Sequence, residues 1–153
     1  MQTRRTLLAQ FTGLLALGPA TLLAESNYPR MQVWKSPTCG CCSKWVTHMQ
    51  NAGFDVTATN VPNVGPYKAE AGLPPDLASC HTAMVAGYFV EGHVPAEDVV
   101  RMLEERADIA GLAVPGMPLG SPGMESSTPE AYDVMAVGKD GSVTVFAHHP
   151  VVA

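Results

Sequence analysis

The chain has 153 residues, of which 46% are hydrophobic, and carries a formal net charge of −5 at pH 7. This length suits one domain, and the composition is typical of a packed globular core and excludes a disordered chain. The few basic residues form no cluster beyond the N-terminus, which argues against nucleic acid as a partner.

The first 24 residues have the layout of an export signal. Arg4 and Arg5 provide a positive start, an apolar run covers 7–17, and small residues follow. The pattern predicts a signal peptide over 1–24 and a single domain over 25–153. Because the paired arginines are similar to those of a twin-arginine signal, both the Sec and the twin-arginine routes stay open.

Export would place the chain in the periplasm. Removing Arg4 and Arg5 leaves seven basic residues against 14 acidic ones, a net charge of −7. No later apolar stretch is long enough to span a bilayer, so no stable membrane insertion is expected after signal removal. Thiols in this compartment become oxidised unless something protects them.

The first half of the domain is predicted to alternate strands and helices. The segment 31–36 is strand-like, and apolar residues at helical spacing then predict a helix that ends at Gly53. The β-branched segment 54–61 predicts a second strand. The segment 64–73 predicts a short helix.

The next elements complete a recognisable order. Two apolar runs within 81–94 flank Ala86-Gly87 and predict a β-hairpin. The segment 95–106 begins with proline and acidic residues and predicts a helix. The resulting order, β-α-β-α-β-β-α, is that of a thioredoxin-like α/β fold.

The C-terminal part is predicted to be an addition to that fold. Residues 109–130 are rich in glycine, proline and serine and are expected to form a long loop. Residues 132–149 predict an extra β-hairpin, with Asp140-Gly141 at its turn.

Cysteines are the most informative residues. Cys39, Cys41 and Cys42 occupy three of four consecutive positions, whereas Cys80 stands alone. In a thioredoxin-like fold the first three would lie at a helix N-terminus, which stabilises thiolates. The same fold would bring Cys80, at the start of the third strand, beside them.

Four converging thiols allow three interpretations. They could form two structural disulfides, such as Cys39–Cys42 and Cys41–Cys80. Cys39 and Cys42 also have the C-x-x-C spacing of a redox dithiol, although Cys41 would compete in each exchange step. A metal–thiolate site would use all four, because neighbouring cysteines are cramped around one zinc ion but suit a polynuclear site. Soft thiolates select Cu(I).

Three other residues are candidate secondary ligands. Met117 and Met124 each end a "PGM" turn in the Pro/Gly-rich loop, and their thioethers are soft ligands, although methionine also fills gaps over a core. His81 follows Cys80 and is either a ligand or a structural histidine.

Three segments resemble the CopG-like family of periplasmic copper-resistance proteins, formerly a domain of unknown function. They are "SPTCGCCSKW" (36–45), "SCHTAMVAGYFVEGHVPAEDV" (79–99) and "GLAVPGMPLGSPGME" (111–125). The resemblance covers nearly the whole mature chain. It implies a thioredoxin-like fold and a multinuclear copper site. The ligand pattern of the family, C-x-C-C plus a distant cysteine, matches Cys39, Cys41, Cys42 and Cys80.

The expected function is therefore periplasmic Cu(I) binding in copper resistance or homeostasis, with redox change between Cu(I) and Cu(II) left open. Copper ions are the expected bound species, and other periplasmic copper-handling proteins are candidate partners. The alternative is a periplasmic thiol–disulfide oxidoreductase that uses Cys39 and Cys42. Cys41 discriminates between the two, because a metal cluster uses this residue and an exchange enzyme does not need it.

Overall fold

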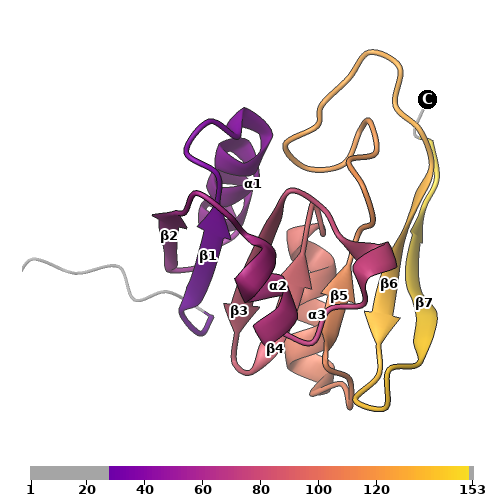
Figure 1. Ribbon diagram of the computed structural model, residues 1–153. Helices are drawn as coiled ribbons and strands as arrows, with labels where there is room; N and C mark the ends of the chain where they lie inside the picture. The colour runs from indigo at the N-terminus through magenta and orange to yellow at the C-terminus, as the bar shows by residue number, and fades with distance from the viewer. Residues whose placement is uncertain (1–27, 152–153) are drawn as a thin grey trace, which may run out of the picture.

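The computed structural model describes residues 28–151, so the predicted signal peptide over 1–24 lies outside the described residues. The described chain is a mixed α/β structure, as predicted, with one seven-stranded sheet and three α-helices (Figure 1). Within 28–151, no helix has the length and apolar character needed to cross a membrane.

The elements follow one another in a simple order. They are β1 (Met31–Lys35), α1 (Gly40–Asn51), β2 (Val56–Asn60), α2 (Gly65–Glu70), the 3-10 helix η1 (Pro75–Leu77), β3 (His81–Val85), β4 (Tyr88–Glu91), α3 (Ala96–Glu105), β5 (Gly111–Ala113), β6 (Tyr132–Val137) and β7 (Val143–His149). Apart from η1, the elements up to α3 have the predicted order. The C-terminal hairpin, β6 and β7, is also present.

The strand β5 corrects the sequence prediction, which treated 109–130 as a loop and counted six strands. The three residues of β5 are buried and pair in parallel with β4 and antiparallel with β6. A strand this short has no detectable period, and its pairing with β4 is non-local, so the composition around it predicted a loop. Gly111 lets the two strands approach closely, since a Cβ there would lie 2.3 Å from the carbonyl oxygen of Phe89.

The sheet has the strand order β2-β1-β3-β4-β5-β6-β7. β1 is parallel to β2 and antiparallel to β3, with Lys35 opposite His81. The end of β1 therefore lies beside the start of β3. This register brings the loop that follows Lys35 next to the residues that precede His81.

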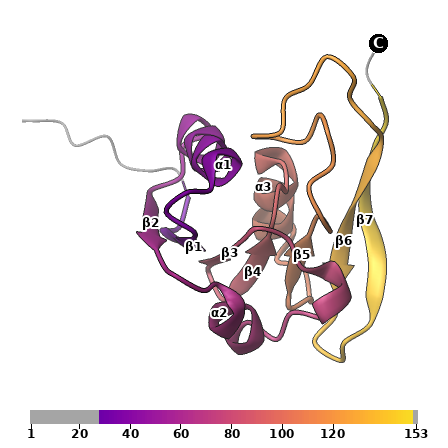
Figure 2. The ribbon, with the colours of Figure 1, turned by 45° about the horizontal axis from the view of Figure 1, so that its top comes forward.

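Helices cover both faces of the sheet. α1 and α3 lie on one face and α2 on the other (Figure 2). The larger core lies under α1 and α3, where Trp45, Met49, Val99 and Met102 are buried. Truncating such an aromatic core residue typically costs about 3–5 kcal/mol. The Trp45 indole also donates to the carbonyl oxygen of Val94 at 2.8 Å, which fixes α1 above the sheet.

Residues 114–131, here called the return segment, connect β5 to β6. In Figures 1 and 2 this segment extends from the sheet toward α1 before it joins β6. It passes close to α1 at Gly123, where an added Cβ would lie 2.7 Å from the carbonyl oxygen of Cys41. The return segment thus adjoins the N-terminal end of α1.

Candidate metal centre

The N-terminus of α1 presents three cysteines in one turn. A backbone hydrogen bond from Cys39 to the Ser36 carbonyl closes the loop after β1. Cys39 is the N-cap residue, and its Sγ accepts from the backbone N–H of Cys42 at 3.4 Å. Because the first turn has no acidic residue, the free N–H groups and the helix dipole favour anionic sulfur there.

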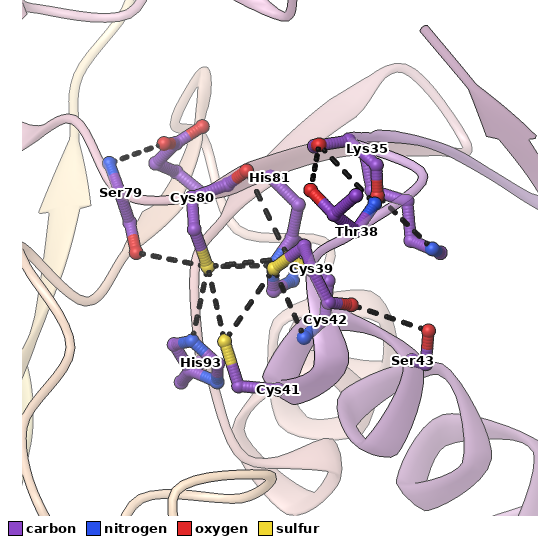
Figure 3. The surroundings of a disulfide bond; sticks show 12 residues. Lys35, Thr38, Cys39, Cys41, Cys42, Ser43, Ser79, Cys80, His81 and His93 are labelled. Atoms are coloured by element: carbon purple, nitrogen blue, oxygen red, sulfur yellow. Dashed lines mark hydrogen bonds between the residues drawn. A yellow bond between two sulfur atoms is a disulfide. The ribbon is translucent and has the colours of Figure 1, made fainter.

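The structure brings all four predicted cysteines together (Figure 3). The four Sγ atoms lie within 4.8 Å of one another. Cys80 Sγ is 3.4 Å from Cys42 Sγ and 3.9 Å from Cys41 Sγ. Cys41 Sγ is 3.5 Å from Cys39 Sγ. Cys80, which directly precedes β3, therefore joins the three cysteines at the N-terminus of α1.

Cys39 and Cys42 form a disulfide bond, and Cys41 and Cys80 are free thiols. Of the two disulfides considered from the sequence, one is present and the other is not. Since only thiolates ligate metals well, the four sulfurs become four ligands only after two-electron reduction of the Cys39–Cys42 bond.

His93 lies beside Cys80 at the edge of this group, and no pattern in the sequence pointed to it. Its Nε2 lies 3.1 Å from Cys80 Sγ, and its Nδ1 lies 2.9 Å from the carbonyl oxygen of Pro122. A carbonyl can only accept, so Nδ1 carries the proton in the neutral ring. The lone pair of Nε2 then faces Cys80, as a metal ligand would require.

A second histidine lies on the other side of Cys80. His81 Nδ1 is 3.4 Å from Cys80 Sγ, while the fully buried Nε2 has no hydrogen-bond partner among the described residues. One donor atom each from Cys80, His81 and His93 lies within 4.8 Å of the others. His81 Nδ1 is the nitrogen that lies beside Cys80, so it is the atom of this ring placed to share a cation with that sulfur.

Burial keeps both imidazoles neutral. It is the main cause that lowers the pKa of His81, and the neighbouring His93 and Lys68 lower this pKa further. Burial likewise lowers the pKa of His93, against the opposing hydrogen bond to Pro122. Neutral imidazoles have free lone pairs and can bind a metal ion.

Burial of the Cys80 thiol disfavours a negative charge on its sulfur. Desolvation first, and then the neighbouring Cys41, raise the pKa of the Cys80 thiol to about 11. In the absence of a cation this sulfur is therefore protonated at neutral pH. A bound metal ion would reverse the balance, because coordination deprotonates a thiol outright.

The two candidate methionines lie in different surroundings. Met117 is 52% exposed. Met124 is partly buried, and its backbone closes a turn by bonds to Gly120 and Ser121, each of 2.8 Å. The exposure of Met117 makes its thioether accessible from solvent.

Three contacts fasten the return segment to the site. Pro122 binds His93, Gly123 packs on the backbone of α1, and Glu125 pairs with Lys44 at 3.5 Å. Gly123 has a φ of +89°, and an added Cβ would lie 3.0 Å from the backbone nitrogen of Trp45. The segment is thus a wall of the cysteine cluster.

Comparisons with known proteins agree with this geometry. Residues 77–124 match the family described as "Protein of unknown function, DUF411". This region contains Cys80 and His93 but none of the α1 cysteines. The chain matches no curated protein.

Two solved structures are similar to nearly the whole described chain. One is of the copper resistance protein CopG, form 2, which is 43% identical with a TM-score of 0.76. The alignment covers 80% of this chain and 99% of that one. Form 1 of CopG gives 42% identity and the same TM-score, over 81% of this chain and 99% of that one.

Proposed function

Because the chain belongs to the family of CopG copper resistance proteins, we propose that it binds copper in a multinuclear Cu(I)–thiolate site that serves copper resistance. The ligands in this proposal are Cys39, Cys41, Cys42 and Cys80. The observation that carries it is the clustering of their four sulfurs within 4.8 Å.

Sulfur chemistry explains the preference for Cu(I). Thiolates are soft ligands and select Cu(I), which also accepts low coordination numbers. Cys41 and Cys42 are adjacent and cannot easily occupy two corners of one tetrahedron, as a zinc site would need. Sulfurs that bridge several ions remove this constraint.

His93 and His81 extend the proposed site with nitrogen. Both rings are neutral, both are buried, and each has a nitrogen within 3.4 Å of Cys80 Sγ. Imidazole binds both Cu(I) and Cu(II), so these two residues support a site in which copper changes its oxidation state. Met117 is proposed as an entry ligand because its thioether is exposed, and Met124 as part of the lid.

The fold and location are proposed on related grounds. The order β2-β1-β3-β4, with β1 antiparallel to β3, supports a thioredoxin-like unit within a single domain over 25–153. The signal-like segment 1–24 supports a periplasmic location, and the disulfide is consistent with it, because disulfides are rare in reducing compartments.

One observation favours a second function, that of a periplasmic thiol–disulfide oxidoreductase. Cys39 and Cys42 form a C-x-x-C disulfide at a helix N-terminus, where exchange-active pairs are found. Cys41 and Cys80 would then have no required part. Copper binding, in contrast, gives every clustered donor a role.

Titration of reduced protein with Cu(I) under anaerobic conditions tests the proposal. A chromophoric Cu(I) chelator serves as competitor, and a free-thiol count before titration confirms four thiols. More than one Cu(I) per chain is expected, with a thousandfold excess of zinc failing to displace it. Saturation at one metal ion, with zinc competing equally, would contradict the proposed site.

A further inference from the structure

Glu91, the last residue of β4, is a buried carboxylate with no exposed surface. It accepts from three donors that come from different parts of the chain. These donors are the Lys68 ammonium of α2, the Ser79 backbone N–H at 2.5 Å and the Thr82 hydroxyl of β3 at 2.7 Å. A buried carboxylate is costly unless its lone pairs are satisfied in this way.

Stability alone does not account for this arrangement. Replacing a buried ion pair by apolar residues of similar volume is often neutral or stabilising. The pair between Glu91 and Lys68, whose side chain is only 15% exposed, is therefore expected to do something that apolar packing could not. What an apolar side chain lacks is an acceptor for the Ser79 N–H.

Ser79 immediately precedes Cys80 and is held from three directions. Glu91 accepts its N–H, and Gly116 accepts its hydroxyl. Gly92, at a φ of +70°, packs against its side chain so closely that an added Cβ would lie 2.5 Å from Ser79 Oγ. The backbone that carries Cys80 is thus clamped between β4 and the return segment.

We propose that Glu91 is the positioning residue for Cys80, because its carboxylate fixes the backbone from which this sulfur reaches the other three. Cys80 alone of the four cysteines lies outside the α1 turn, so its placement depends on this clamp. The inference deepens the proposed function, since bridging ligands must be held closely. The clamp itself is a property of the metal-free protein and can be tested without copper.

Two double variants separate positioning from charge. Glu91→Gln with Lys68→Met removes both charges but keeps a side-chain acceptor for the Ser79 N–H. Glu91→Leu with Lys68→Met removes the charges and the acceptor together. If Glu91 serves only as the partner of Lys68, the two double variants will behave alike.

Alkylation of Cys80 is the first measurement. A Cys41→Ser background with the Cys39–Cys42 disulfide intact leaves Cys80 as the single free thiol, which iodoacetamide and mass spectrometry then monitor. Release of the clamp exposes the thiol and removes part of its burial. The Leu variant should react about tenfold faster or more than the Gln variant, which should react like the background protein.

Glu91→Asp guards against a Leu variant that fails to fold. It keeps the charge but withdraws the carboxylate by one methylene, and faster alkylation of Cys80 is again expected. Equal rates in the background, Gln, Leu and Asp proteins would overturn the proposal. If the Leu variant does not fold, equal alkylation rates of Cys80 in the background and Asp proteins would also overturn the proposal.

Copper titration is the second measurement, carried out with Cys41 restored. Fewer Cu(I) ions per chain are expected in the Leu variant than in the Gln variant. The Leu variant could alkylate faster at Cys80 and still bind the wild-type amount of copper. Glu91 would then position Cys80 only in the metal-free protein, and its role in the copper site would be overturned. Wild-type protein that binds no copper would refute the proposed function, while the alkylation rates would still decide the role of Glu91.

Discussion

Cys41 Sγ and Cys80 Sγ lie 3.9 Å apart although 39 residues separate them in the chain. Both are free thiols, and both lie beside the Cys39–Cys42 disulfide. The pair therefore joins the two halves of the cluster, one on α1 and one at the start of β3. Cys41 has no necessary part in C-x-x-C exchange, so this contact distinguishes the two candidate functions.

Cys41→Ser should sharply reduce copper binding while leaving the fold intact. The change removes one of the four sulfurs of the proposed site at a partly exposed position, so the core is not disturbed. Cu(I) titration of the reduced variant, with urea unfolding as a control for stability, measures both effects. Full copper content together with loss of disulfide exchange on a model substrate would instead support the oxidoreductase.

Replacing Met117 and Met124 together by Leu should slow copper loading or release without removing the cluster. Thioethers bind Cu(I) more weakly than thiolates, and Leu conserves apolar volume, so stability should change by less than about 1.5 kcal/mol. Stopped-flow transfer to a Cu(I) chelator measures the rate. Met135→Leu, in β6 outside the return segment, is the matched control. Transfer at the wild-type rate in the double variant would leave both methionines with a packing role alone.

Gly123→Ala should detach the return segment from α1. The new Cβ would meet the backbone of α1 at 2.7 Å, at a position whose φ already disfavours any side chain. We expect a loss of roughly 1–3 kcal/mol in the free energy of unfolding, measured with urea.

Gly116→Ala is the control for that change. Gly116 has a φ of +68° but open space around its missing Cβ, so this variant reports the backbone strain alone. If Gly123→Ala loses more unfolding free energy than Gly116→Ala, the difference is due to the contact with α1. Equal losses at both positions would mean that the close approach contributes nothing.

Metal-free protein should lose stability as the pH falls below 6.5, partly through His48. Its Nε2 accepts the N–H of Ala96, the first residue of α3, at 3.0 Å, and protonation destroys this acceptor. Burial lowers the pKa of His48, with Glu97 and Glu125 opposing the shift. As the pH falls, His48 is therefore protonated in the unfolded chain before it is protonated in the folded one. The stability that His48 contributes above pH 6.5 is lost as the pH falls from 6.5 toward the lower pKa of the folded state.

His48→Gln tests this contribution, because the amide oxygen of Gln can accept the same bond without titrating. Urea midpoints at pH 7.5 and pH 5.5 should fall less in the variant than in the wild type. His81 and His93 keep their own contributions in both proteins. An identical fall in the two proteins would exclude His48 as a source of the pH dependence.

Much of the site followed from the sequence, and the exceptions have physical causes. The element order placed Cys80 beside the α1 cysteines, because that placement needs only the pairing of β1 with β3. β5 was missed because three residues in a Gly/Pro-rich segment have no period, and its partner β4 lies twenty residues away. Local pattern cannot show such a pairing.

His93 was missed because a lone histidine has no spacing signal of its own. The predicted hairpin turn at Ala86-Gly87 nevertheless contained the information. Its register pairs Thr82 with Glu91, and continuing that register by two residues would set Cys80 opposite His93, whose side chains do lie 3.1 Å apart. Extending the hairpin to its open end would have identified this residue.

The pairing of Lys35 with His81 has a consequence for how the centre is assembled. A slip of one residue would shift Cys80 by about 3.3 Å along the strand and turn the side chains of β3 to the opposite face. Such a chain would retain its α1 cysteines but leave the fourth sulfur out of reach. In the proposed copper site, only chains with the correct pairing of β1 and β3 would therefore offer all four sulfurs to the metal.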